Sequence, residues 1–167
     1  MDQSGKINRF MTLPILMGGG AVWAIAVFTR LSVGAPYTVL HKLGIGDMLP
    51  PLWFMGLVWS LLYVLVGAVI GYLLSHPQLN AQKEACLWRG CTFIVSAVVL
   101  SLVWYTLLFG KFWLLPSWIC LGLSCGCAIF CALSWWQIGK ASALIIGMFV
   151  LWEIMVSILQ LSIIIST

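Results

Sequence analysis

The chain has 167 residues, of which 63% are hydrophobic and only 7% are charged. Water-soluble domains carry about 25% charged residues, so this composition excludes a soluble globular domain and indicates an integral membrane protein. The net charge of +4 is small and scattered, which argues against a nucleic-acid partner. The six cysteines lie mostly inside apolar segments and do not form the disulfide framework of a small secreted protein.

Five apolar segments are long enough to cross a hydrocarbon core of ~30 Å as helices. The expected helices cover residues 11–28, 51–74, 91–109, 113–136 and 141–165. The sequence therefore predicts an all-α integral membrane protein, a bundle of five transmembrane helices in a single domain over residues 1–167. The last two connections are very short and force antiparallel neighbours, whereas the connection over residues 30–50 is long enough to act as a lid.

The basic residues favour one orientation of this bundle. No small-residue cleavage site follows the first apolar segment, so we expect that segment to stay as a helix. Five basic residues fall on the side of the N-terminus and three on the other: Lys6, Arg9, Lys83, Arg89 and Lys140 against Arg30, Lys42 and Lys111. This bias favours a cytoplasmic N-terminus. We expect a multi-pass protein of the bacterial cell membrane.

The ten tryptophans divide by depth. Those near expected helix ends fit interfacial anchoring: Trp53, Trp88, Trp113, Trp118, Trp135 and Trp136. Four lie deeper, and a rise of ~1.5 Å per residue puts them in the same half of the membrane, beneath the long connection. These four are Trp23, Trp59, Trp104 and Trp152.

Helical spacing groups the deep aromatic residues with small and polar ones. The second helix has Gly56, Trp59, Tyr63, Gly67 and Gly71 on one face. The third has Ala97, Ser101, Trp104, Tyr105 and Leu108, and the fifth has Phe149, Trp152, Glu153, Val156 and Gln160. Such faces can line an aromatic cleft for a flat hydrophobic ligand, or they can pack against one another as core.

Glu153 is the only acidic residue inside an expected span. A charge at mid-membrane costs roughly 3 kcal/mol on insertion scales, so its side chain is expected to face the protein interior or to be protonated. Gln160 lies two turns further along the same face. A ligand contact, a proton site and a neutral carboxyl bonded to a neighbouring helix all remain open for Glu153.

The small residues of the spans indicate packing rather than chemistry. Gly67 and Gly71 in the second helix, and Gly122 and Gly126 in the fourth, have the spacing of close helix contacts, which we expect within the fold. The triple Gly18-Gly19-Gly20 makes the first helix flexible. The fourth-helix cysteines lie on a packing face, and no metal site or soluble-enzyme constellation is apparent.

The segment "PPLWFMGLVWSLLY", which ends at Tyr63, resembles the second-helix pattern PPxWxFGxVWxxLY of the TspO/MBR family, the translocator proteins or tryptophan-rich sensory proteins. Weaker matches retain Tyr37 in the first connection, Trp104 in the third helix and Trp152 in the fifth. Ser101 replaces the usual asparagine of the third helix, and Gln160 the asparagine of the fifth. The chain resembles a divergent member of the family.

The resemblance implies a homodimer of five-helix bundles with a cleft for tetrapyrroles such as protoporphyrin IX or haem. Its cleft positions correspond here to Tyr37, Trp59, Tyr63, Ser101, Trp104, Trp152 and Val156. The helical faces add three more candidate ligand-binding residues, Phe149, Glu153 and Gln160. We expect no required cofactor, with porphyrin or haem as ligand, and membrane lipid as the surroundings.

Three functions remain open at this stage. The first is a membrane receptor for porphyrin-like or other flat hydrophobic ligands, with a sensory or stress-regulatory role and no catalytic residue. The second is a light-dependent porphyrin-degrading enzyme, in which the resemblance implicates Trp59 and Trp152. The third is a small transporter of tetrapyrrole or lipid, for which the first-helix glycines and Glu153 are the relevant features.

Overall fold

A computed structural model describes residues 4–33, 51–75 and 80–166, apart from the side chains of residues 4–12, 52 and 166. The described residues form five helices long and apolar enough to cross a membrane, and no strand. The expected all-α bundle of five transmembrane helices is therefore confirmed. The elements are α1 (Ser4–Val33), α3 (Leu52–Leu74), α4 (Ala81–Tyr105), η1 (Thr106–Gly110), α5 (Leu114–Trp136) and α6 (Lys140–Ser166).

Two helices are longer than the sequence indicated. The first expected helix ends at residue 28, but α1 continues through Arg30 to Val33. The third expected helix begins at residue 91, but α4 begins at Ala81, where the Asn80 side chain accepts a hydrogen bond from the backbone N–H of Lys83 (3.0 Å). This cap starts a polar helical turn that hydropathy alone does not detect. Of the expected lid, residues 30–33 are helical and residues 34–50 lie outside the described part of the chain.

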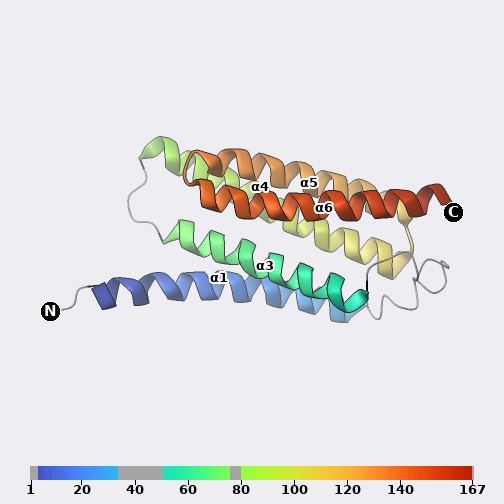
Figure 1. The fold of residues 1–167 in the computed structure, drawn as a ribbon, viewed down its shortest axis with the longest axis horizontal. Helices are drawn as coiled ribbons and strands as arrows, with labels where there is room; N and C mark the ends of the chain where they lie inside the picture. The colour runs from blue at the N-terminus through green and yellow to red at the C-terminus, as the bar shows by residue number, and fades with distance from the viewer. Residues whose placement is uncertain (1–3, 34–50, 76–79, 167) are drawn as a thin grey trace.

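The helices form two layers (Figure 1). α1 and α3 run antiparallel in one layer, and α4, α5 and α6 make up the other. Within each layer the backbones lie side by side, whereas the layers meet mainly through side chains. A π-helical segment, η1, follows α4 directly, and Phe112, which has a positive φ of 59°, stands between η1 and α5.

Glycine contacts hold α1 against α3. A Cβ on Gly67 would overlap the backbone of Gly18, and a Cβ on Gly71 would overlap that of Pro14. The expected close contact at Gly67 and Gly71 is therefore confirmed. Gly18 of α1 serves the same contact, so it acts as a packing residue, and the expected flexibility of the glycine triple stays a prediction.

The small-residue pair of α5 behaves differently. A Cβ on Gly122 or on Gly126 would meet no atom of the described structure within 4 Å. The expectation that this pair packs within the fold was wrong, because these residues point away from α4 and α6. The expected homodimer is not tested by this observation and stays a prediction.

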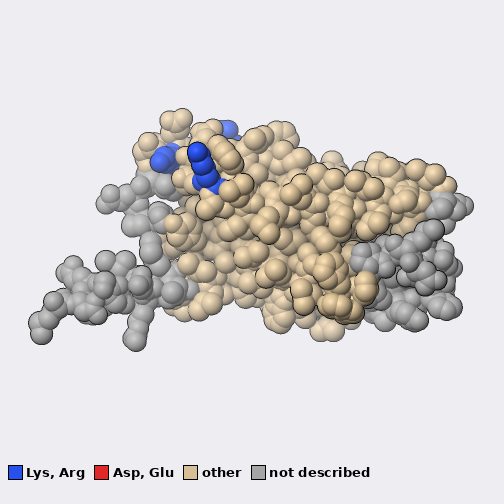
Figure 2. Space-filling view, viewed as in Figure 1, with Lys and Arg blue, Asp and Glu red and all other residues tan. Residues whose placement is uncertain are grey.

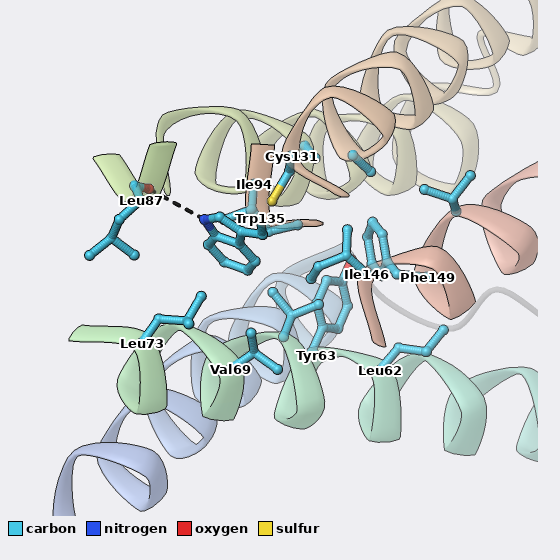
Figure 3. Packing of buried hydrophobic residues seen from close by; sticks show 14 residues of the cluster. Leu62, Tyr63, Val69, Leu73, Leu87, Ile94, Cys131, Trp135, Ile146 and Phe149 are labelled. Atoms are coloured by element: carbon cyan, nitrogen blue, oxygen red, sulfur yellow. Dashed lines mark hydrogen bonds between the residues drawn. The ribbon is translucent and has the colours of Figure 1, made fainter. Parts of the chain in front are cut away.

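The core fills the space between the layers (Figure 3). Tyr63, Val69 and Leu73 of α3 face Ile146 and Phe149 of α6 and Trp135 of α5. Trp135 was expected at the membrane interface, but it is fully buried and its Nε1 donates to the Leu87 carbonyl (3.3 Å). The reason is Gly90, because a Cβ at that position would overlap the Trp135 ring.

Other tryptophans near helix ends are exposed, as interfacial anchors are: Trp53, Trp88, Trp113 and Trp136. Trp118 is half-buried, and its Nε1 donates to the Ser157 carbonyl (3.2 Å). Trp23 of α1 was expected to lie with the three other deep tryptophans, but its side chain is 43% exposed and does not contact them. Depth along a helix predicts the level of a ring in the membrane but not the direction in which it points.

The basic residues whose side chains the structure describes lie near the ends of the bundle. In Figure 2 the basic atoms gather at one end of the molecule, and the long middle of that face carries neither sign. Of the described basic residues, Lys83, Arg89 and Lys140 lie where α4 and α6 begin, and Arg30 and Lys111 lie at the opposite end. This separation agrees with the span assignment, and the direction of insertion stays a prediction.

The glycine contacts make a direct prediction for stability. Gly67→Ala should destabilise the protein by roughly 1–3 kcal/mol, because the added methyl forces the α1 and α3 backbones apart. Gly126→Ala is the matched control and should be neutral or stabilising by up to ~1 kcal/mol, because alanine favours helix and the site is open. Thermal unfolding in detergent measures both. Equal effects of the two substitutions would contradict the packing described here.

Candidate ligand site between the helix layers

Five aromatic rings from α3, α4 and α6 meet where the two layers face each other. Trp59 is at the centre of this aromatic cluster. Its ring centroid lies within about 6 Å of its neighbours, at 5.5 Å from Tyr63, 5.6 Å from Trp104, 6.0 Å from Phe149 and 6.3 Å from Trp152. Trp59 and Tyr63 are stacked, and Phe149 and Trp152 approach edge-on, as aromatic pairs prefer.

Helical periodicity explains why these rings converge. Trp59 and Tyr63 are four residues apart on α3, and Phe149 and Trp152 are three apart on α6, so each pair shares one face. Tyr63, Trp104 and Phe149 are buried, whereas Trp59 and Trp152 are half-buried. The cluster thus has a closed inner side and an accessible side formed by two indoles.

The polar end of Tyr63 is used inside the protein. Its hydroxyl lies 2.8 Å from Ser101 Oγ, which itself donates to the Val98 carbonyl (2.9 Å). A serine hydroxyl has one proton, so Tyr63 is the donor and Ser101 the acceptor. Ser101, expected to line a cleft, is fully buried and holds the Tyr63 hydroxyl, and its role in ligand binding stays a prediction.

Gln160 has a similar structural role. Its Oε1 accepts from Trp104 Nε1 (2.7 Å), and its Nε2 donates to Ser117 Oγ (2.6 Å) and the Leu114 carbonyl (2.9 Å). These bonds join α6 to α4 and to the beginning of α5. Gln160 is buried, and its amide donates hydrogen bonds to Ser117 and Leu114 while its oxygen accepts one from Trp104. Gln160 therefore fixes the orientation of the Trp104 indole.

Glu153 is 0% exposed and points toward α4 and α5. Ser124 Oγ is within hydrogen-bonding distance of both Glu153 Oε1 and the Ala97 carbonyl. The serine has one proton and the carbonyl can only accept, so both contacts are hydrogen bonds at once only if the carboxyl carries a proton. A neutral carboxylic acid also avoids the cost of a buried charge.

Three polar atoms of the described side chains are buried without a hydrogen-bond partner. They are Trp152 Nε1, Glu153 Oε2 and Tyr105 Oη. Buried polar groups are nearly always bonded, so these atoms are candidates to meet a guest molecule. Trp152 and Tyr105 both pack on the smaller hydrophobic cluster formed by Trp104, Leu108, Leu121 and Val156.

Of the two remaining expected site residues, the structure describes one and not the other. Val156 is buried beneath Trp104 and Trp152 and contributes packing. Tyr37 lies outside the described residues. The structure therefore brings Trp59, Tyr63 and the α4 and α6 rings together, and their role in ligand binding stays a prediction.

Sequence reasoning missed Arg30, whose guanidinium lies against the backbone of Gly56. A Cβ on Gly56 would overlap this guanidinium, so the glycine makes room for the arginine side chain. The signal in the sequence was a basic residue in the last turn of the first span, opposite a glycine near the start of the second. Among the described residues no group of His, Cys, Asp or Glu could hold a metal ion, and the cysteines are unpaired.

The described spans and the aromatic cluster define a five-helix integral membrane protein whose two helix layers meet through indole and phenol rings. The TspO/MBR family model matches residues 10–165, nearly the whole chain, so the protein belongs to the TspO/MBR family. Comparisons with curated proteins and with solved structures gave no match.

The hydrogen bonding of Glu153 predicts an asymmetry between two substitutions. Glu153→Gln should change the free energy of unfolding by less than about 1.5 kcal/mol, because the amide has the same shape and can donate to Ser124. Glu153→Ala should cost roughly 2–5 kcal/mol, because it leaves a cavity and removes one of the two hydrogen bonds of Ser124. Thermal unfolding in detergent compares them. If glutamine is as damaging as alanine, the carboxyl is not a neutral partner of Ser124.

Proposed function

We propose that the protein is a membrane receptor or binding protein for porphyrin-like tetrapyrroles or other flat hydrophobic ligands, with a sensory or stress-regulatory role. Family membership supports a tetrapyrrole-binding or sensory type of role at the level of the family. The observation that carries the proposal for this chain is the aromatic cluster around Trp59 at the meeting of the two helix layers.

The geometry of the cluster suits a planar guest. Trp59 and Trp152 contact each other edge-on from opposite layers and are half-buried, so a flat ring can stack on an indole face from the accessible side. Phe54, 40% exposed and 6.3 Å from Trp152, extends this aromatic surface. A guest inserted there would replace ring-to-ring contacts by ring-to-ligand contacts of the same kind.

Hydrogen bonds hold the inner wall of the cluster in place. Ser101 fixes Tyr63, and Gln160 fixes Trp104, so ligand binding does not have to order these rings. A prearranged wall reduces the entropic cost of binding. The two half-buried indoles are then the side chains on which affinity depends most.

Porphyrin titration tests the proposal. Trp59→Ala and Trp152→Ala should each weaken binding about tenfold or more, because each removes a stacking surface. Trp88→Ala is the control, because Trp88 is exposed and lies near the start of α4, away from the cluster. Trp135 is not used as a control, because it is fully buried and its removal would disturb the core. The shift of the porphyrin absorption band measures binding without relying on tryptophan fluorescence, and melting temperatures check the fold. Equal weakening in all three variants would contradict a localised site.

The contact between Trp59 and Trp152 also favours a second candidate, light-dependent degradation of a bound porphyrin. In that case illumination of the complex in air should give a porphyrin product at a rate that falls at least about tenfold in Trp59→Phe, because phenylalanine keeps an apolar ring but is far harder to oxidise than indole. Absorbance during illumination measures this rate, with Trp88→Phe as control. An unchanged rate in Trp59→Phe would exclude a role of this indole in such a reaction.

A transporter is less well supported. Its features in the sequence were the glycines of the first helix and Glu153. Gly18 packs on α3, and one carboxyl oxygen of Glu153 bonds to Ser124, so both residues have structural contacts that do not require transport.

A further inference from the structure

Arg30 turns inward at the end of α1. It lies within the first membrane span, and its half-buried side chain places the guanidinium on the buried backbone of Gly56. An arginine near a helix end usually extends toward the headgroups and away from the protein. Here α3 has Gly56 at the point of contact, and any larger residue there would exclude the Arg30 guanidinium.

This cation has no acidic partner among the described residues. Glu84 is in the first turn of α4, at the opposite end of the bundle. Glu153 is bonded to Ser124. A guanidinium partly removed from water is costly without an anion, so the position favours an anionic group that the described residues do not supply.

Tyr105 is a polar residue that interacts with this cation. The Arg30 guanidinium lies within electrostatic and hydrogen-bonding reach of the Tyr105 hydroxyl, where the cation can only donate and the phenol proton stays free to donate to a further group. Tyr105 Oη is buried and has no other partner. Arg30 and Tyr105 therefore present unused hydrogen-bond donors at one place.

This pair adjoins the aromatic cluster. The Tyr105 ring contacts Trp104 with a centroid distance of 6.4 Å, and Trp104 contacts Trp59. Gly56, on which Arg30 lies, is one turn before Trp59 on α3. A ligand that stacks on the cluster would thus have its edge near a cation and a hydroxyl.

We propose that Arg30 and Tyr105 form an anion subsite at the edge of the aromatic cluster, which binds a carboxylate of the flat ligand. This inference rests on the proposed function and narrows its ligand class to planar rings that carry an acidic side chain. A guanidinium donates two parallel hydrogen bonds to a carboxylate, and such a pair is stronger where water is excluded. The Tyr105 hydroxyl supplies a third donor.

A pair of probes with the same ring isolates this subsite. Protoporphyrin IX has two carboxylates, and its dimethyl ester has none. Wild-type protein should bind the acid roughly tenfold or more tightly than the ester, as expected for charge-assisted hydrogen bonds. Binding is measured by the shift of the porphyrin absorption band in detergent at constant ionic strength.

Three variants test whether Arg30 and Tyr105 cause the tighter binding of the acid. Arg30→Gln should abolish the preference for the acid and leave ester affinity unchanged, and Tyr105→Phe should reduce the preference. Gly56→Ala should also reduce it, because the added methyl displaces the guanidinium while keeping the charge. Arg89→Gln is the matched control, since Arg89 is an exposed arginine near the other end of the bundle, and it should keep the wild-type preference.

The outcomes separate the two proposals. If wild-type protein binds acid and ester equally, or if Arg30→Gln weakens both equally, the subsite is refuted and the aromatic site stands. If the preference for the acid survives in Arg30→Gln, the carboxylate is bound elsewhere and the subsite is refuted. If neither probe binds the wild-type protein, the proposed porphyrin function fails, and the subsite fails with it.

Discussion

The structure depends on a contrast in how closely its helices approach. Between α1 and α3, Gly18 and Gly67 allow backbone to meet backbone. Between α3 and α6, the rings of Trp59 and Phe149 hold the backbones apart and fill the space between them. Because lipid is as apolar as these side chains, helices in a membrane associate through packing and hydrogen bonds rather than through the hydrophobic effect. Ring packing therefore joins the two layers.

Hydrogen bonds then decide which of these rings are fixed. Ser101 and Gln160 use the polar ends of Tyr63 and Trp104, and Ser124 binds Glu153. Each bond is shielded from water, so its loss would leave an unsatisfied group in a region of low dielectric constant. The same network leaves other donors and acceptors unused, and the proposed ligand and anion sites both depend on this division between used and unused groups.

Much of this architecture could be predicted from the sequence. The spans follow from the length of the apolar segments, and the shared faces of Trp59 with Tyr63 and of Phe149 with Trp152 follow from helical periodicity. The pattern around Pro50 and Pro51 pointed to the family that the whole chain matches. Helix ends were less predictable, because the start of α4 depends on a capping bond from Asn80 in a polar segment.

The sequence by itself determined the number and type of the helices and the faces on which large and small residues lie, because these depend only on local composition and on a period of 3.6 residues. Only the tertiary structure decided which face meets which. It buried Trp135 against Gly90, left Trp23 and the α5 glycines facing outward, and turned Arg30 onto Gly56. The physical reason is that burial and hydrogen-bond partnership belong to pairs of elements, and residues far apart in the chain are paired only when the helices pack.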